Sequence, residues 1–180
     1  MLASHHDLGI DATMPYRLIV DGLMSEVRRY ATNRPSFWYE NAVERADKAN
    51  LLIEQEGLGM SRYLPYMLVI EGLMSEINRK ASDRSPFWYE NAVERADKAR
   101  ILKRGHGVDI DVANLGYGTI INGLVMEAAH NITQKPYGKK NATQKANRAM
   151  NLATQYVNDR VQELTASFQQ MGLSLEPQKI

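Results

Sequence analysis

The chain has 180 residues, of which 44% are hydrophobic, and a formal net charge of +1 at pH 7. This length and hydrophobic content predict a folded protein with a substantial core and argue against global disorder. The small net charge gives no bulk electrostatic reason to bind nucleic acid or an acidic membrane. The chain contains no cysteine, which excludes disulfides, zinc–thiolate sites and thiol catalysis.

Targeting signals are also missing from the sequence pattern. No apolar run approaches the roughly 18 residues of a membrane-spanning helix. The first residues, MLASHHDLGID, lack the basic region and apolar stretch of a secretory signal. We therefore expect a cytoplasmic or virion protein that is neither secreted nor membrane-embedded.

A repeat of 50 residues determines the predicted architecture. The 13 residues FWYENAVERADKA occur at 37–49 and again at 87–99. Around them, 24 of the 35 aligned positions of 15–49 and 65–99 are identical. A period of this length is typical of tandem supersecondary units.

A third, degenerate copy follows. Its Tyr117, Gly123 and Glu127 keep step with Tyr16, Gly22 and Glu26 of the first copy. The offset from the first copy is 101 residues early in this copy and 100 residues later, so one residue has been gained near 114–116 and one has been lost again before Asn141. We predict a single domain over 1–180, with repeats at 6–55, 56–105 and 106–156 and a C-terminal helical extension and tail at 157–180.

Each repeat contains two predicted helices. In the first, apolar residues recur at helical spacing on one stripe: Tyr16, Val20, Leu23, Met24, Val27, Tyr30 and Ala31. The second is expected to begin near Ser36 or Ser85, and its inward stripe is Tyr39, Ala42, Val43, Ala46, Ala49 and Ile53.

The short turn near 33–35 makes the two helices antiparallel neighbours. A single hairpin cannot bury its own apolar face, so neighbouring units must stack. We therefore predict an all-α fold of three tandem antiparallel hairpins, six main helices, forming a bundle or short array. The extension is expected to continue the last helix.

Three glycines lie in the middle of the first helix of each repeat: Gly22, Gly72 and Gly123. Glycine there costs about 1 kcal/mol relative to alanine. Its presence in all three copies predicts helix packing at these positions, where another backbone approaches closely. A ligand that approaches the backbone is the alternative.

A carboxylate stripe marks the second helix. Glu40, Glu44 and Asp47 follow at i, i+4 and i+7, and the next copy repeats them as Glu90, Glu94 and Asp97. The Glu-x-x-Asp pattern on a helix that follows an acidic helix resembles the all-α nucleoside triphosphate pyrophosphatases of the MazG type.

That resemblance implies Mg²⁺ held against a triphosphate by Glu44, Asp47, Glu94 and Asp97, which would be both catalytic residues and metal ligands. The first half of the family pattern is replaced here by Asp21 and Glu26, which are about 140° apart around the helix. The competing interpretation is a solvated face without metal or cofactor, in which Glu44 pairs with Lys48 one turn away.

The third copy reverses the charge of this face. Residues 137–149 carry Lys139, Lys140, Lys145 and Arg148 and no acid. One hypothesis is head-to-tail assembly, in which the acidic face of one subunit (Glu40, Glu44, Glu90, Glu94) meets the basic face of another. A second is contact with nucleic-acid phosphates. A third is drift on a solvated surface.

Two aromatic pairs open the second helices, Phe37-Trp38 and Phe87-Trp88. They are candidate interface anchors, and packing within the hairpin corner is the alternative. Together these features favour a non-catalytic structural or interaction protein in a homo-oligomer, such as a virion component or scaffold. The alternatives are the Mg²⁺-dependent pyrophosphohydrolase and a nucleic-acid-binding accessory protein.

Overall fold

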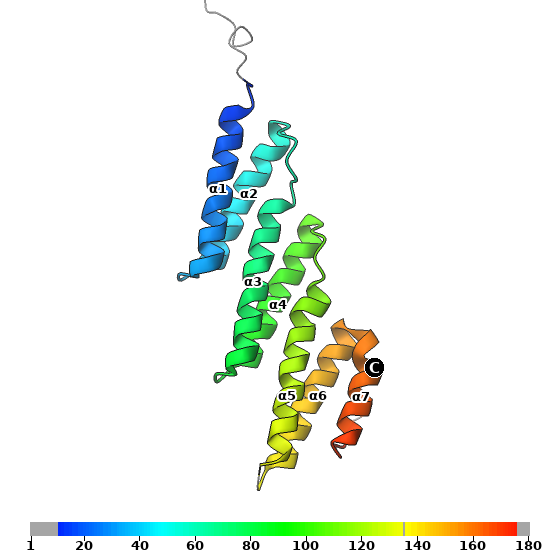
Figure 1. Cartoon of the computed structure of the whole chain (residues 1–180). Coiled ribbons are helices and arrows are strands. Elements are labelled where there is room, and N and C mark those ends of the chain that lie inside the picture. Colours follow the sequence, from blue (N-terminus) through cyan, green and yellow to red (C-terminus); the bar gives the residue numbers. More distant parts are fainter. Residues whose placement is uncertain (1–10, 135, 176–180) are drawn as a thin grey trace, which may run out of the picture. The chain divides into compact units, whose positions relative to one another are not determined.

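The computed structural model describes residues 11–134 and 136–175, and this part of the chain is helical without any strand. The predicted all-α fold is therefore confirmed for these residues (Figure 1). Residues 6–10 of the first predicted repeat and 176–180 of the tail lie outside them. None of the helices described is long and apolar enough to cross a lipid bilayer.

The described residues form seven α-helices and two short helical turns. The helices are α1 (Met14–Asn33), α2 (Trp38–Gln55), α3 (Leu64–Asp83), α4 (Trp88–His106), α5 (Thr119–Ile132), α6 (Gly138–Tyr156) and α7 (Val161–Gln170). The turns are the π-helical η2 (Ala113–Gly118) and the 3-10 turn η3 (Asn158–Arg160).

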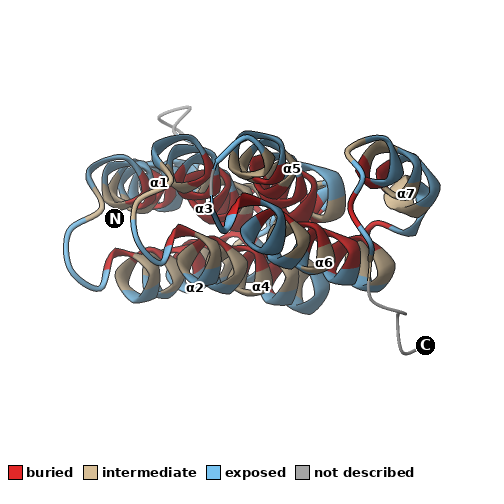
Figure 2. Ribbon diagram, turned by 90° about the horizontal axis from the view of Figure 1, so that it is seen from below, coloured by how far each residue is buried: buried red, intermediate tan, exposed pale blue. Residues whose placement is uncertain are grey.

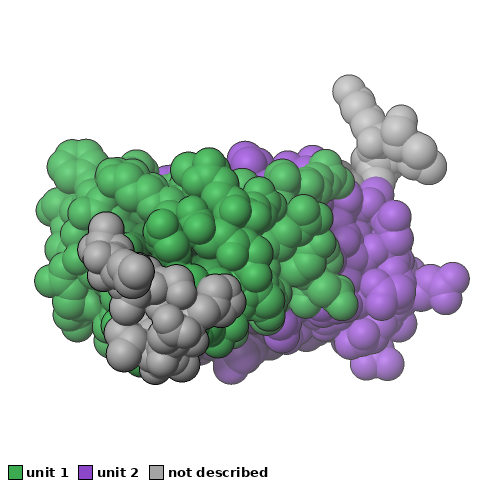
Figure 3. All heavy atoms as spheres, turned by 90° about the horizontal axis from the view of Figure 1, so that it is seen from above, with its two compact units in different colours: residues 1–73, 102–110 green, residues 74–101, 111–180 purple. Residues whose placement is uncertain are grey.

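The chain divides into two compact units (Figure 3). Unit 1 comprises residues 1–73 and 102–110, and unit 2 comprises residues 74–101 and 111–180. The division falls inside α3 and α4, so these two helices contribute residues to both units.

In unit 1, α1 and α2 pack side by side (Figure 1). Their apolar stripes meet in a core of Val20, Met24, Ala49, Ile53 and Leu58. The three alanines of α2, Ala42, Ala46 and Ala49, are fully buried, because their small side chains allow the helices to approach closely.

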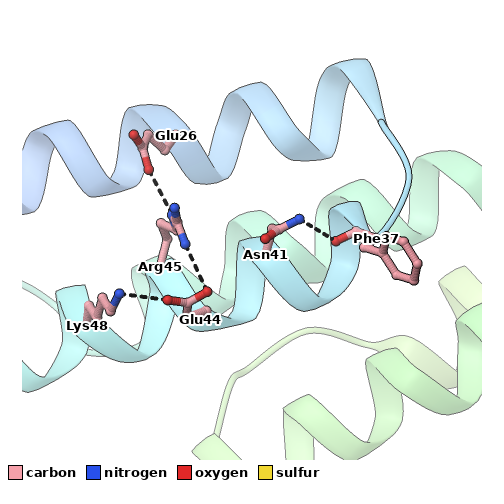
Figure 4. A network of polar contacts seen from close by, with 6 residues as sticks. All are labelled: Glu26, Phe37, Asn41, Glu44, Arg45 and Lys48. Carbon is pink, nitrogen blue, oxygen red and sulfur yellow. Dashed lines mark hydrogen bonds and ion pairs between the residues drawn. The ribbon is translucent and has the colours of Figure 1, made fainter.

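The turn between α1 and α2 ends slightly later than the sequence predicted. Helix α2 begins at Trp38, two residues after the expected Ser36. Phe37 adopts a left-handed backbone (φ 58°), which starts the helix after it. The side-chain amide of Asn41 donates a hydrogen bond to the backbone carbonyl of Phe37 at 2.9 Å and stabilises the first turn of α2 (Figure 4).

In unit 2, α5 and α6 pack along their length, and the sides that face each other are buried (Figure 2). Ile120, Ile121 and Leu124 of α5 are fully buried, as are Ala142 and Ala146 of α6. The small alanines of α6 therefore allow α5 and α6 to approach closely, as the alanines of α2 do for α1 and α2.

The π-helical turn η2 lies where the third copy carries its extra residue. It spans Ala113–Gly118 and leads directly into α5. A π turn closes i to i+5 hydrogen bonds, so it absorbs one inserted residue without ending the helix. Tyr117 therefore keeps its register with Tyr16 and Tyr66.

The prediction that the C-terminal extension continues the last helix is wrong. Helix α6 ends at Tyr156, and Val157 leaves the helical conformation (φ −140°, ψ 59°). The chain turns through η3, and α7 packs against α6 with Leu164 and Phe168 buried. These two side chains need an apolar partner, which a straight extension would not provide. The described chain therefore has seven helices instead of six.

Candidate interaction surface

An ion pair joins the two helices of each repeat. Arg45 of α2 donates to Glu26 of α1 at 2.9 Å (Figure 4), and Arg95 of α4 donates to Glu76 of α3 at 3.0 Å. In unit 2, Lys145 lies 2.5 Å from Glu127. We call this ion pair between the two helices of a repeat the acid–base clamp. It was not predicted from the sequence, although an acid and a base recur at the same positions in all three copies.

The clamp involves Lys145, which the sequence assigned to a basic interface. Its side chain is 26% exposed and is held against Glu127 within its own hairpin. Arg148 pairs with Glu90 at 3.4 Å and lies over the ring of Tyr89. Lys139 and Lys140 are exposed. Two of the four basic side chains thus make contacts within this chain.

The outward carboxylates of the acidic stripe pair with neighbouring bases. Glu44 accepts hydrogen bonds from Lys48 at 2.7 Å and from Arg45 at 2.9 Å (Figure 4). Lys48, and then Arg45, lower the pKa of the Glu44 carboxyl. Glu94 pairs with Arg95 at 2.7 Å and with Lys98 at 3.1 Å. These contacts hold each carboxylate along its own helix.

The two aspartates of the proposed metal site accept hydrogen bonds from tyrosines of the following repeat. The hydroxyl of Tyr66 donates to Asp47 at 2.8 Å, and that of Tyr117 donates to Asp97 at 2.6 Å. Burial, and next the bond to the aspartate, raise the pKa of both tyrosines well above the usual range. The described residues contain no cluster of three or more His, Asp or Glu side chains able to hold a metal.

Two of the three repeated glycines lie against a tryptophan. A Cβ at Gly72 would lie 2.7 Å from the Cβ of Ala31 and 3.2 Å from the Trp38 ring. At Gly123 it would lie 2.9 Å from the Trp88 ring. Trp38 and Trp88 are 7% and 3% exposed. The two tryptophans therefore lie buried between one repeat and the next, and their predicted role as interface anchors stays a prediction.

Gly22 differs from the other two glycines. A Cβ at this position would meet no atom of the described residues within 4 Å, so no contact among these residues supports the helix-packing role predicted for Gly22. The reason is that no helix among the described residues covers this side of α1.

The same substitution should therefore have opposite effects at two equivalent positions. We expect Gly72→Ala to lower the free energy of unfolding by about 1–2 kcal/mol, because the backbone of Ala31 cannot move aside easily. Gly22→Ala should raise it by about 0.5–1 kcal/mol through helix propensity. Urea denaturation of both variants at low protein concentration measures the difference, and equal effects would contradict this account of the junction.

The exposed aromatic side chains are not the tryptophans but their neighbours. Phe37 is 77% exposed, Phe87 is 76% exposed, and the equivalent Tyr137 is 70% exposed. Each lies in the turn between the two helices of its repeat. These residues keep their place as candidate contacts for a partner.

A larger apolar surface lies on α1. We define the α1 face as Pro15, Tyr16, Ile19, Gly22, Leu23 and Glu26. Ile19 is 50% exposed, whereas the equivalent Val69 and Ile120 are 0% exposed. Tyr16 is 37% exposed, whereas Tyr66 and Tyr117 are 3% and 1% exposed.

Two further exposed apolar side chains of α1 lie outside this face. Met14 is 54% exposed and Leu18 is 63% exposed. The first half of α1 is accordingly exposed from Met14 to Ile19. The face repeats the pattern that α3 and α5 bury against the preceding helices, but here it is uncovered. Helical periodicity could not predict this exposure, because it does not say which repeat lacks a neighbour.

Comparison with known proteins adds no further constraint. No protein-family model, curated protein or solved structure shows a significant match to this chain. The geometry of α1 and of the repeat junctions is therefore the basis for assigning a function.

Proposed function

We propose that this chain is a non-catalytic helical-repeat protein that works in an oligomeric assembly, as a scaffold or a virion component. The observation that carries this proposal is the α1 face. Ile19 is half exposed at a position that is fully buried in both later copies. A surface built to pack against helices, and left uncovered in the single chain, is suited to binding another protein.

The proposal includes the tandem-hairpin architecture predicted from the sequence. Three recurring contacts support it. Each repeat carries the acid–base clamp between its two helices. The tyrosine that begins the second and third repeats bonds to an aspartate of the repeat before it. Six residues after each of these tyrosines, Gly72 and Gly123 lie against the tryptophan of the preceding repeat.

Energetics favour association over permanent exposure. Removing a large aliphatic side chain from water contributes roughly 1.5–3 kcal/mol. Leu18 and Ile19 are each at least half exposed on neighbouring sides of α1. Covering these side chains therefore contributes favourably to the free energy of association.

The native mass of the full chain tests this function. Sedimentation velocity from about 1 to 100 μM spans the dissociation constants of ordinary homo-oligomers. We expect a species whose mass is a multiple of the 20.4 kDa chain mass. A single-chain mass over the whole range would contradict the proposed homo-oligomer.

A further inference from the structure

We propose that a pocket in unit 1 binds a guanidinium group, carried by a small molecule or by an arginine side chain of another protein. The pocket has a volume of about 290 Å³ and is lined by the last turns of α2 and α4 and by residues at the start of α3. This volume is at the lower end for ligand sites, so it suits a group of side-chain size. The pocket shares no residue with the α1 face, and the inference goes beyond the proposed assembly.

The pocket offers acceptors for hydrogen bonds. The side-chain oxygen of Asn50 is buried and has no hydrogen-bond partner among the described residues. The carboxylate of Glu54, one turn later on α2, also lines the pocket. Helix α2 ends at Gln55 and α4 ends at His106, so the C-termini of two helices add partial negative charge here. A ligand that donates hydrogen bonds and carries positive charge therefore fits this pocket.

Two stacked rings form another part of the lining. The rings of Tyr66 and His106 both line the pocket, and their centroids are 3.6 Å apart. The Tyr66 hydroxyl donates to Asp47 at 2.8 Å, and Asp47 lies three residues before Asn50 on α2. A carboxylate, an amide oxygen and an aromatic stack thus lie close together at the end of α2.

The cation that the chain itself brings to the pocket is Arg62, and it is bound to other groups. Its guanidinium donates to the Tyr63 hydroxyl at 2.9 Å and lies 3.5 Å from Glu54. The side chain of Arg62 is 58% exposed. Neither contact satisfies the side-chain oxygen of Asn50, which stays without a partner among the described residues.

Unit 2 contains the same arrangement with an arginine in place of Asn50. Tyr117 donates to Asp97 at 2.6 Å, and its ring stacks on Tyr156 with centroids 3.9 Å apart. The residue 50 positions after Asn50 is Arg100. Its Nη2 lies 3.5 Å from Asp97, and its guanidinium carbon lies 5.3 Å from the centre of the Tyr156 ring. In unit 2 the chain therefore supplies its own guanidinium.

The shorter side chain of Asn50 leaves this position open in unit 1. A guanidinium from outside takes the place that Arg100 fills in unit 2 and lies over the His106 ring, because its planar group stacks on aromatic faces. Its fork of N–H groups donates to Glu54 and to Asn50, whose amide turns towards it about its soft terminal torsion. The ligand thereby gives the Asn50 oxygen the partner it lacks.

A titration with a matched neutral control tests the binding. The probe is N-acetyl-arginine amide, and the control is N-acetyl-citrulline amide, which has the same shape without the charge. Amide NMR signals are followed at pH 7.5, where imidazole groups are ordinarily mostly uncharged. We expect saturable shifts around the pocket with a dissociation constant of about 1 mM or lower. Binding of citrulline should be at least about 10-fold weaker. No saturable shift, or equal binding of both compounds, overturns the inference.

Two arginine substitutions separate occupation of the pocket from added charge. Asn50→Arg places a guanidinium where Arg100 holds one in unit 2, and it should weaken binding of the probe at least about 10-fold. Leu51→Arg adds the same charge at a residue that is 52% exposed and does not line the pocket. It should change the dissociation constant less than about 2-fold at 0.15 M salt. Unchanged binding to Asn50→Arg, or equal weakening in both variants, overturns the inference. Urea denaturation checks that both variants are folded.

A longer probe identifies the source of the guanidinium. If acetyl-Gly-Arg-Gly-amide binds at least as tightly as N-acetyl-arginine amide, the pocket accepts an arginine side chain of a protein. If the flanking residues weaken binding more than about 10-fold, the ligand is a small molecule, and both results support the guanidinium site. A monomeric chain that binds the probe contradicts the proposed homo-oligomer alone, so the two proposals can fail separately.

Discussion

Replacing Trp88 with alanine is expected to lower the free energy of unfolding by about 3–5 kcal/mol. The side chain is 3% exposed, and its ring lies in contact range of Gly123 on the next repeat. Its indole N–H donates to Glu127 at 2.8 Å. Truncation would therefore leave a cavity and remove one of the hydrogen bonds of a half-buried carboxylate. Small domains have only about 5–15 kcal/mol of stability in total.

The adjacent residue supplies the control for this prediction. Phe87 is also aromatic, but it is 76% exposed. Phe87→Ala should change stability by no more than about 0.5 kcal/mol, as is usual for surface positions. Thermal and urea unfolding of the two variants should separate them clearly. Similar decreases in the free energy of unfolding for Phe87→Ala and Trp88→Ala would contradict the burial of Trp88.

The second large effect is expected from Arg95→Met, which should lower the free energy of unfolding by about 3–5 kcal/mol. Arg95 donates to Glu76 at 3.0 Å, and the side chain of Glu76 is only 8% exposed. Methionine keeps the aliphatic part of the side chain but removes the charge. The carboxylate is then left buried without its ionic partner, and water can hardly reach it.

The equivalent change in the first repeat isolates the effect of burial. Arg45→Met removes the same contact, at 2.9 Å, within a nearly identical sequence. The side chain of Glu26, however, is 44% exposed and can be solvated again. The loss for Arg45→Met should therefore be a small fraction of that for Arg95→Met. Equal losses would show that the clamp acts through something other than the desolvation of its acid.

Helix type and order could be predicted because they depend on local patterns. The stripe of Val20, Met24 and Val27, the buried alanines of the second helix and the short turns all follow from residues within one repeat. The extra residue of the third copy could also be located, since the offset of Tyr117 reveals it. The π turn η2 is the way in which the helix absorbs that residue.

The role of the polar residues could not be predicted in the same way. Asp47 and Asp97 looked like parts of a metal site, but each accepts a bond from a tyrosine 19 or 20 residues away. Helical periodicity predicts on which side of its helix a carboxylate lies. Whether a tyrosine of the next hairpin reaches it depends on how two hairpins pack, which no local pattern records.

The amino-acid order alone predicted a helical protein with a 50-residue repeat and the residues that face inward on each helix. The folded structure decided which copies have neighbours. Gly22 and Gly72 have the same sequence context, yet one is open and the other lies against Ala31 and Trp38. Burial arises from contacts between residues far apart in the chain, so identical repeats acquire different surfaces. For that reason only the tertiary structure shows that the apolar face of α1 is exposed among the described residues.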